Sequence, residues 1–176
     1  MRKLQTYELN RVTTEEFKSI KKIPLVVVLD NVRSLHNVGS VFRSADAFKV
    51  EKIYLCGITG QPPHKEIQKT ALGATESVDW EYYDSTKILV QKLKKQNRIL
   101  IAIEQTTGAE NVLDFRTHTN SLYAVIFGNE VKGIDQKVIN LCDKCLEIPQ
   151  FGTKHSLNIS VCAGIVIWEF FKQLGN

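Results

Sequence analysis

Five aliphatic runs recur along the chain and predict β-strands. They cover residues 25–29, 52–56, 98–103, 122–127 and 145–148. Most of these runs are continuously apolar and do not alternate between apolar and polar positions. Such runs are typical of strands that are covered on both faces in a mainly parallel sheet.

Helical periodicity between and after these runs predicts helices over residues 38–48, 85–96, 135–142 and 156–174. In the first of them the apolar side chains recur on one face, and Asn37 stands at the expected N-cap. The alternation of strands and helices indicates an α/β fold, with a mainly parallel sheet flanked by helices. We expect this domain to span residues 25–176.

Residues 1–24 form a polar extension that precedes this domain. Thr13 and Glu16 have the spacing of a capping box, which predicts a short helix from residue 14 to about residue 21. The basic side chains of the extension either contact phosphate or belong to a solvated helix face.

The final predicted helix is apolar around its whole circumference, since residues 161–171 contain a single charged side chain, Glu169. A helix of this kind must be covered on every side. At the end of a chain of 176 residues, a second subunit is the simplest cover. The sequence therefore predicts a homodimer with Ile165, Trp168 and Phe171 near the interface.

Composition narrows the class of protein without naming a partner. The net charge of +4 permits an anionic partner but does not require one. No apolar run approaches the ~20 residues of a membrane span, and the amino terminus has no signal-peptide pattern. The four cysteines do not suggest a disulfide framework, so we expect a cytoplasmic protein with reduced thiols. The pair Cys142 and Cys145 lacks a second ligand pair, so no metal site is expected.

Three polar segments, each shortly after a predicted strand, are the candidates for chemistry. They read Asn-x-Gly-x-x-x-Arg at residues 37–43, Phe-Gly-Asn-Glu-x-x-Gly at 127–133 and Ile-Pro-x-x-Gly-x-x-x-Ser-Leu-Asn-x-Ser at 148–160. Taken singly, the first could be a helix cap with a surface arginine and the second a turn with a solvated acid. The third places Ser156 and Asn158 at an expected helix start, where unpaired backbone donors can face a ligand.

In this order and spacing, the three segments resemble the motifs of the SpoU/TrmH RNA 2′-O-ribose methyltransferases of the SPOUT class. The resemblance covers the chain from about residue 25 to its end and implies a SPOUT-like methyltransferase domain with a carboxyl-terminal deep trefoil knot. It implies S-adenosylmethionine as cofactor, tRNA or rRNA as substrate, and a homodimer. The catalytic positions that it implies are Asn37, Arg43, Glu130, Ser156 and Asn158. The implied cofactor-binding positions are Ile103, Gly128, Ile148 and Leu157.

The resemblance implies that Arg43 activates the 2′-hydroxyl. We expect it to act in its charged form, because a guanidinium stays protonated at neutral pH and is a poor base. We expect it to bind the adjoining phosphate and to stabilise negative charge that develops on the 2′-oxygen. Asn37 and Glu130 would orient Arg43, while Ser156 and Asn158 shape the pocket. Two alternatives stay open at this point: methylation of an RNA base, and an RNA-binding protein that has lost catalysis.

Overall fold

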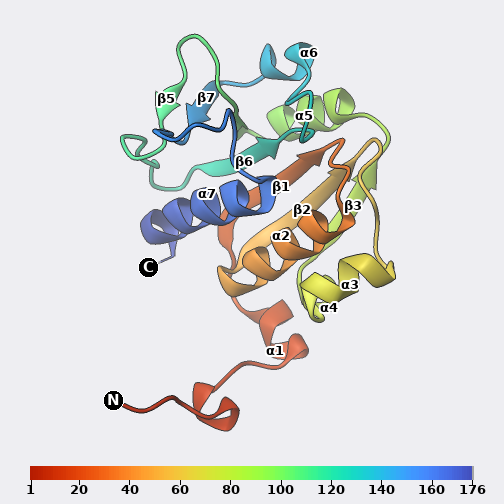
Figure 1. Ribbon diagram of the computed structural model, residues 1–176, viewed down its shortest axis with the longest axis vertical. Coiled ribbons are helices and arrows are strands. Elements are labelled where there is room, and N and C mark those ends of the chain that lie inside the picture. Colours follow the sequence, from red (N-terminus) through yellow and green to blue (C-terminus); the bar gives the residue numbers. More distant parts are fainter. Residues whose placement is uncertain (176) are drawn as a thin grey trace.

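A seven-stranded sheet runs through the computed structural model, which describes residues 1–175 (Figure 1). The strand order is β3-β2-β1-β6-β4-β7-β5, and every pair of these strands is parallel. The strands are β1 (Ile23–Asp30), β2 (Val50–Cys56), β3 (Trp80–Tyr83), β4 (Arg98–Ile103), β5 (Glu110–Asn111), β6 (Leu122–Phe127) and β7 (Lys144–Glu147). The predicted α/β fold with a mainly parallel sheet is confirmed.

Helices cover both faces of this sheet. The helices are α1 (Thr14–Ser19), α2 (Leu35–Ala47), α3 (Lys65–Ala71), α4 (Ala74–Ser77), α5 (Thr86–Lys95), α6 (Gln136–Ile139) and α7 (Ile159–Leu174), and a 3₁₀ turn, η1, spans Thr6–Leu9. Buried side chains of α1, α2, α3, α4 and α7 belong to one apolar cluster, and those of α5 and α6 to a second. In Figure 1 the first group lies in front of the sheet and the second behind it.

The central strand β1 shows why its run is apolar without interruption. Leu25, Val27 and Leu29 pack into the cluster under α2 and α7. Val26 and Val28 pack into the cluster under α5 and α6. Successive side chains of a strand point to opposite faces of the sheet, and here all five are fully buried. Neither face therefore leaves a position for a polar residue.

Two helix starts differ from the sequence prediction. Ser34, not Asn37, is the N-cap of α2, because its hydroxyl accepts a hydrogen bond from the backbone N–H of Asn37 at 3.2 Å. Helix α7 begins at Ile159 and not at residue 156, because Asn158 has an extended ψ of 135° and caps the helix. Residues 156–158 therefore belong to a loop.

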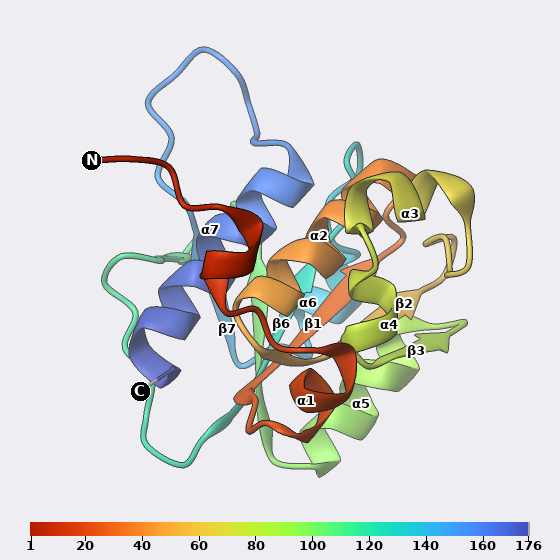
Figure 2. The ribbon, with the colours of Figure 1, turned by 90° about the horizontal axis from the view of Figure 1, so that it is seen from below.

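Other elements were shorter than predicted or were missed. Helix α6 is a four-residue turn within the predicted range 135–142. The edge strands β3 and β5 and the helices α3 and α4 were not predicted. Helix α1 confirms the capping box at Thr13, and it buries Phe17 close to α4 at the end of the molecule seen in Figure 2. The domain boundary at residue 24 and the trefoil knot stay predictions.

Helix α7 buries one face and leaves the other open. Its buried face includes Ala163, Val166 and Phe170, which are fully inaccessible. On the other face Val161 is 51% exposed, Ile165 38% and Trp168 48%. A single chain does not cover this apolar face, as expected from the sequence, and the homodimer stays a prediction. Within residues 1–175, no helix has both the length and the apolar character needed to cross a membrane.

Candidate active site

The loops that follow β4, β6 and β7 surround a cavity of about 670 Å³. The first turn of α7 contributes Ile159 and Cys162 to its wall. A volume of this size is usual for a small-molecule or cofactor site, and the carboxyl ends of parallel strands are its usual place. The cavity is therefore the candidate active site of this chain.

All four positions predicted to hold a cofactor line this cavity: Ile103, Gly128, Ile148 and Leu157. Gly128 has a specific steric reason to be glycine. A Cβ at this position would lie 2.3 Å from the carbonyl carbon of Gly133 and 2.3 Å from the backbone nitrogen of Ile134. Only glycine therefore lets the turn over residues 128–133 close against itself.

Three of the predicted catalytic residues meet at one hydrogen-bonded group. Glu130 accepts a hydrogen bond from the side-chain amide of Asn37 at 3.2 Å. The side-chain amide of Asn158 donates in turn to Oδ1 of Asn37, also at 3.2 Å. Each of the three motifs contributes one of these side chains, so the fold joins the motifs physically.

Glu130 also binds the loop between β1 and α2. Its two carboxylate oxygens accept the backbone N–H groups of Arg33 at 2.9 Å and Ser34 at 3.0 Å. Burial alone would raise the pKa of Glu130, but these donors together with Asn37 hold the pKa below the usual glutamate value. Glu130 is therefore an ionised acceptor that fixes the start of α2.

Asn129 strengthens the same connection and was not singled out from the sequence. Its side-chain amide donates to the carbonyl of Asn31 at 2.8 Å. Its Oδ1 accepts the backbone N–H groups of Val131 at 2.9 Å and Lys132 at 3.0 Å. The second motif is thus tied to the loop after β1 next to Glu130, and the position of Asn129 beside Glu130 was the available signal.

Glu104 is a second residue that sequence reasoning missed. It follows β4, lines the cavity, and accepts the backbone N–H groups of Gln105 at 3.0 Å and Ile134 at 3.1 Å. Gln105 donates from its side chain to the carbonyl of His155 at 2.9 Å. These contacts join the loop after β4 to the residue that follows the second motif and to the third motif.

Asn158 and Ser156 occupy different positions around the cavity, which both residues line. Oδ1 of Asn158 accepts the backbone N–H of Ser160 at 2.9 Å and the Ser160 hydroxyl at 2.6 Å. Ser156 lies in the exposed loop before α7, and its hydroxyl has no hydrogen bond within residues 1–175. Asn158 is held in place, while Ser156 is accessible to a ligand.

Arg43 lies apart from this group, in a hollow over α2 and α3 that also contains Ser44, Phe48 and Lys69. Among residues 1–175 its guanidinium forms no ion pair, and neither Asn37 nor Glu130 hydrogen-bonds to it. The expected orientation of Arg43 by these two side chains is therefore not present within one chain. Six residues along α2 from Asn37, Arg43 lies about 9 Å further along the helix axis.

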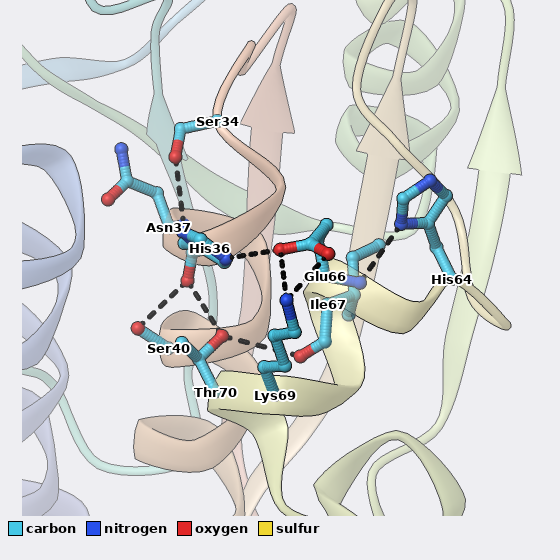
Figure 3. A network of polar contacts seen from close by, with 9 residues as sticks. All are labelled: Ser34, His36, Asn37, Ser40, His64, Glu66, Ile67, Lys69 and Thr70. Carbon is cyan, nitrogen blue, oxygen red and sulfur yellow. Dashed lines mark hydrogen bonds and ion pairs between the residues drawn. The ribbon is translucent and has the colours of Figure 1, made fainter.

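The helix α2 is held firmly against α3 beside this hollow (Figure 3). Glu66 pairs with both His36 and Lys69 at 2.8 Å, and Thr70 donates to the carbonyl of His36 at 2.9 Å. Figure 3 shows the side-chain amide of Asn37 pointing away from this network.

Gly39 of the first motif permits the close contact between α2 and α3, because a Cβ there would lie 2.2 Å from the carbonyl oxygen of Ile67.

Within residues 1–175, no group of three or more His, Cys, Asp or Glu side chains has the arrangement of a metal site.

The sequence of this chain matches the model of the SpoU rRNA Methylase family over residues 24–168. It is 32% identical over 151 residues to the 23S rRNA (guanosine-2′-O-)-methyltransferase RlmB of Blochmanniella floridana, covering 86% of this chain and 58% of that protein. It is 30% identical over 154 residues to the tRNA (guanosine(18)-2′-O)-methyltransferase of Aquifex aeolicus, covering 85% and 69%. The chain therefore spans about three fifths to two thirds of the length of these relatives.

Solved structures of RNA-modifying enzymes superpose on this fold. The A. aeolicus TrmH/SpoU tRNA modifying enzyme superposes with a TM-score of 0.79 at 26% identity, covering 91% of this chain and 79% of that one. The AdoMet-bound rRNA methyltransferase of Sinorhizobium meliloti superposes with a TM-score of 0.81 at 23% identity, covering 90% and 60%. With the family match over most of its length, the chain belongs to the SpoU rRNA Methylase family.

Proposed function

We propose that this chain transfers a methyl group from S-adenosylmethionine to the 2′-hydroxyl of a ribose in tRNA or rRNA. The observation that supports this most is the hydrogen-bonded group of Asn37, Glu130 and Asn158 beside the 670 Å³ cavity. The relatives named above methylate guanosine riboses in 23S rRNA and in tRNA, which favours ribose methylation over base methylation. We propose that the reaction takes place in the cytoplasm, which is consistent with tRNA or rRNA as substrate.

The cavity has the chemistry that the proposed cofactor needs. Ile103, Ile148 and Leu157 offer apolar surface to an adenine ring, and the loop backbones offer hydrogen-bonding groups to its edge. Gly128 leaves main chain in the wall without a side chain in front of it. When bound there, S-adenosylmethionine supplies a methyl group on a positively charged sulfur.

The protein groups near the cavity hold and orient the reactants. Glu130, Asn37 and Asn158 fix the motif loops relative to one another, which restricts the positions open to the incoming ribose. The Ser156 hydroxyl faces the cavity as a free donor for cofactor or RNA. In our proposal, a positively charged Arg43 binds the phosphate next to the target ribose and stabilises negative charge on the 2′-oxygen.

We propose further that the chain acts as a homodimer through the exposed face of α7. Trp168 on that face packs against Phe48, with ring centroids 5.3 Å apart. Phe48 also lines the hollow that contains Arg43. A second copy that covers Trp168 would therefore place Arg43 at the edge of the subunit interface, which gives the isolated guanidinium a role in a site built by two chains.

The proposal is tested with tritium-labelled S-adenosylmethionine, incubated separately with total tRNA and with rRNA and followed by digestion to nucleosides. We expect label in a 2′-O-methylated nucleoside and none in DNA of the same sequence, since DNA lacks the 2′-hydroxyl. Label in a base would establish the alternative reaction instead. Failure of the protein to bind the cofactor in calorimetry would overturn the proposed activity and favour an RNA-binding protein without catalysis.

A further inference from the structure

Phe151 is 96% exposed, although it stands next to the candidate active site in the chain. A phenylalanine ring has no hydrogen-bonding group, and burying it would remove on the order of 150–250 Å² of surface from water. Other large side chains of the third motif are better covered: Leu157 is 38% exposed and Ile159 is 7% exposed. The exposed ring is therefore available to an external partner.

The loop that presents Phe151 runs along the rim of the cavity. Its neighbours Gln150, His155 and Ser156 line the cavity. Figure 2 shows this loop, between β7 and α7, projecting from the body of the molecule. The hydrogen bond from Gln105 to the carbonyl of His155 holds its far end. A partner that binds Phe151 therefore lies next to residues that line the cavity.

The loop segment that contains Phe151 is basic, although Glu104, Glu130 and Glu147 line the cavity beside it. Residues 148–158 contain Lys154 and His155 but no Asp or Glu. Lys132 stands on the turn that lines the cavity, next to the 75% exposed Val131. An exposed aromatic ring with a lysine three residues away in the same loop fits the way proteins bind unpaired nucleotides, with the base on the ring and a phosphate near the positive charge.

We propose that Phe151 stacks on an unpaired nucleobase of the RNA substrate, adjacent to the ribose that enters the cavity, while Lys154 contacts the phosphate backbone. This inference rests on the proposed function for the identity of the partner. It defines the substrate class more closely, because a base inside a duplex cannot offer its face to a side chain. The target nucleotide therefore lies in a single-stranded or loop region.

The first test compares Phe151→Ala, Phe151→Leu and Phe151→Trp for binding of a 12-nucleotide single-stranded oligoribonucleotide and of total tRNA. Stacking on an aromatic ring contributes about 1–3 kcal/mol per base, so loss of the ring should weaken binding at least about fivefold. Leucine should behave like alanine, and tryptophan should restore the affinity. Ile88→Ala, which removes a 62% exposed side chain from α5, is the matched control and should bind RNA normally.

A second measurement reports on stacking itself. Fluorescence of Phe151→Trp, read as the difference from the unsubstituted protein because of Trp80 and Trp168, should be quenched by the oligoribonucleotide. The same oligoribonucleotide without bases, or annealed to its complement, should leave it unquenched. Calorimetric affinity for S-adenosylmethionine should stay the same in all Phe151 variants.

Two outcomes would overturn the inference. One is unchanged RNA affinity in Phe151→Ala, and loss of dimers in sedimentation of the same variant would then assign the ring to a subunit contact. The other is tryptophan fluorescence of Phe151→Trp that the oligoribonucleotide does not quench. These binding measurements do not depend on methyl transfer. A failure of the proposed activity is therefore distinguished from a failure of the stacking contact.

Discussion

The side-chain amide of Asn158 donates a hydrogen bond to Oδ1 of Asn37 over 3.2 Å, although 121 residues separate them. Asn158 caps α7, and Asn37 lies in the first turn of α2. Because Asn37 also donates to Glu130, a chain of hydrogen bonds links α7, α2 and the turn after β6. The beginnings of the two helices are thus fixed relative to the cavity by polar contacts as well as by their apolar cluster.

Glu130→Gln should destabilise the protein in a pH-dependent manner. Its hydrogen bonds hold the pKa of the Glu130 carboxyl below its usual value. The stabilisation is therefore present above the unfolded-state pKa near 4.3, and it is lost as the pH falls through the folded-state pKa. At pH 7 we expect the free energy of unfolding to fall by about 1–3 kcal/mol, because the amide cannot accept both backbone donors.

Urea unfolding of the two proteins from pH 7 to pH 3 measures this prediction. The difference between wild type and Glu130→Gln should narrow as the pH falls below the unfolded-state pKa near 4.3 and through the lower folded-state pKa, because Glu130 then becomes uncharged like glutamine. Glu15→Gln, at an exposed position in the first turn of α1, is the control and should differ little from wild type at any pH. A constant difference across the range would contradict an ionised Glu130.

Arg43→Ala should lower methyl transfer at least about a hundredfold while leaving cofactor affinity nearly intact. The guanidinium lies outside the cavity, so its loss removes only stabilisation of the substrate and of the developing charge. Loss of one such electrostatic contact typically lowers kcat by roughly 10²–10³. Calorimetry and single-turnover transfer separate the two effects, with the exposed Lys95→Ala as control. Cofactor affinity that falls as steeply as turnover would place Arg43 in the cofactor site instead.

The sequence predicted the central strands because their hydrophobicity is continuous, and it missed the sheet edges because these are not. All four residues of β3 are only partly buried, and β5 has two residues, so neither produces a distinct apolar run. Helix α3 buries only Ile67 and Ala71, too few positions to define a helical period. The hydrophobic pattern along the sequence follows from burial, so elements that are only half-buried do not show it.

The motifs led to Asn37, Glu130 and Asn158, which the fold brings together, but they did not predict how these side chains pair. Asn37 was expected to cap α2, yet Ser34, three residues earlier, fills that role and leaves the Asn37 side chain free to reach Glu130. Glu130 was expected to bind Arg43 but accepts backbone N–H groups from the loop after β1. Such pairings depend on how distant loops meet, which a pattern along the chain does not contain.

Substitutions at Trp168 and Phe170, two positions apart on α7, should affect different properties: the oligomeric state for Trp168 and the stability of the fold for Phe170. Trp168→Glu changes an exposed side chain and should convert dimers to monomers in sedimentation velocity. Phe170 is fully buried against Phe115 and Tyr123, with ring centroids 5.5 Å and 5.4 Å away. Phe170→Ala should therefore lower the free energy of unfolding by about 3–5 kcal/mol. Dimers that persist in Trp168→Glu would contradict an interface on this face.

Cys162 should react slowly with iodoacetamide, and the bound cofactor should slow it further. Burial, aided by the Glu104 carboxylate, raises the pKa of the Cys162 thiol to about 11, and burial raises that of Cys142 to about 12. At pH 8 the reactive thiolate of Cys162 is then about a thousandth of the total, so alkylation should be at least about a hundredfold slower than in urea.

Mass spectrometry of alkylated peptides follows the two cysteines separately. Cys162 lines the cavity and Cys142 does not, so S-adenosylmethionine should protect Cys162 while leaving the rate at Cys142 unchanged. Protection of both would indicate a general tightening of the fold and not occupation of the cavity. Rapid alkylation of Cys162 in the native protein would show that the α7 end of the cavity is open to solvent, contrary to the burial that raises its pKa.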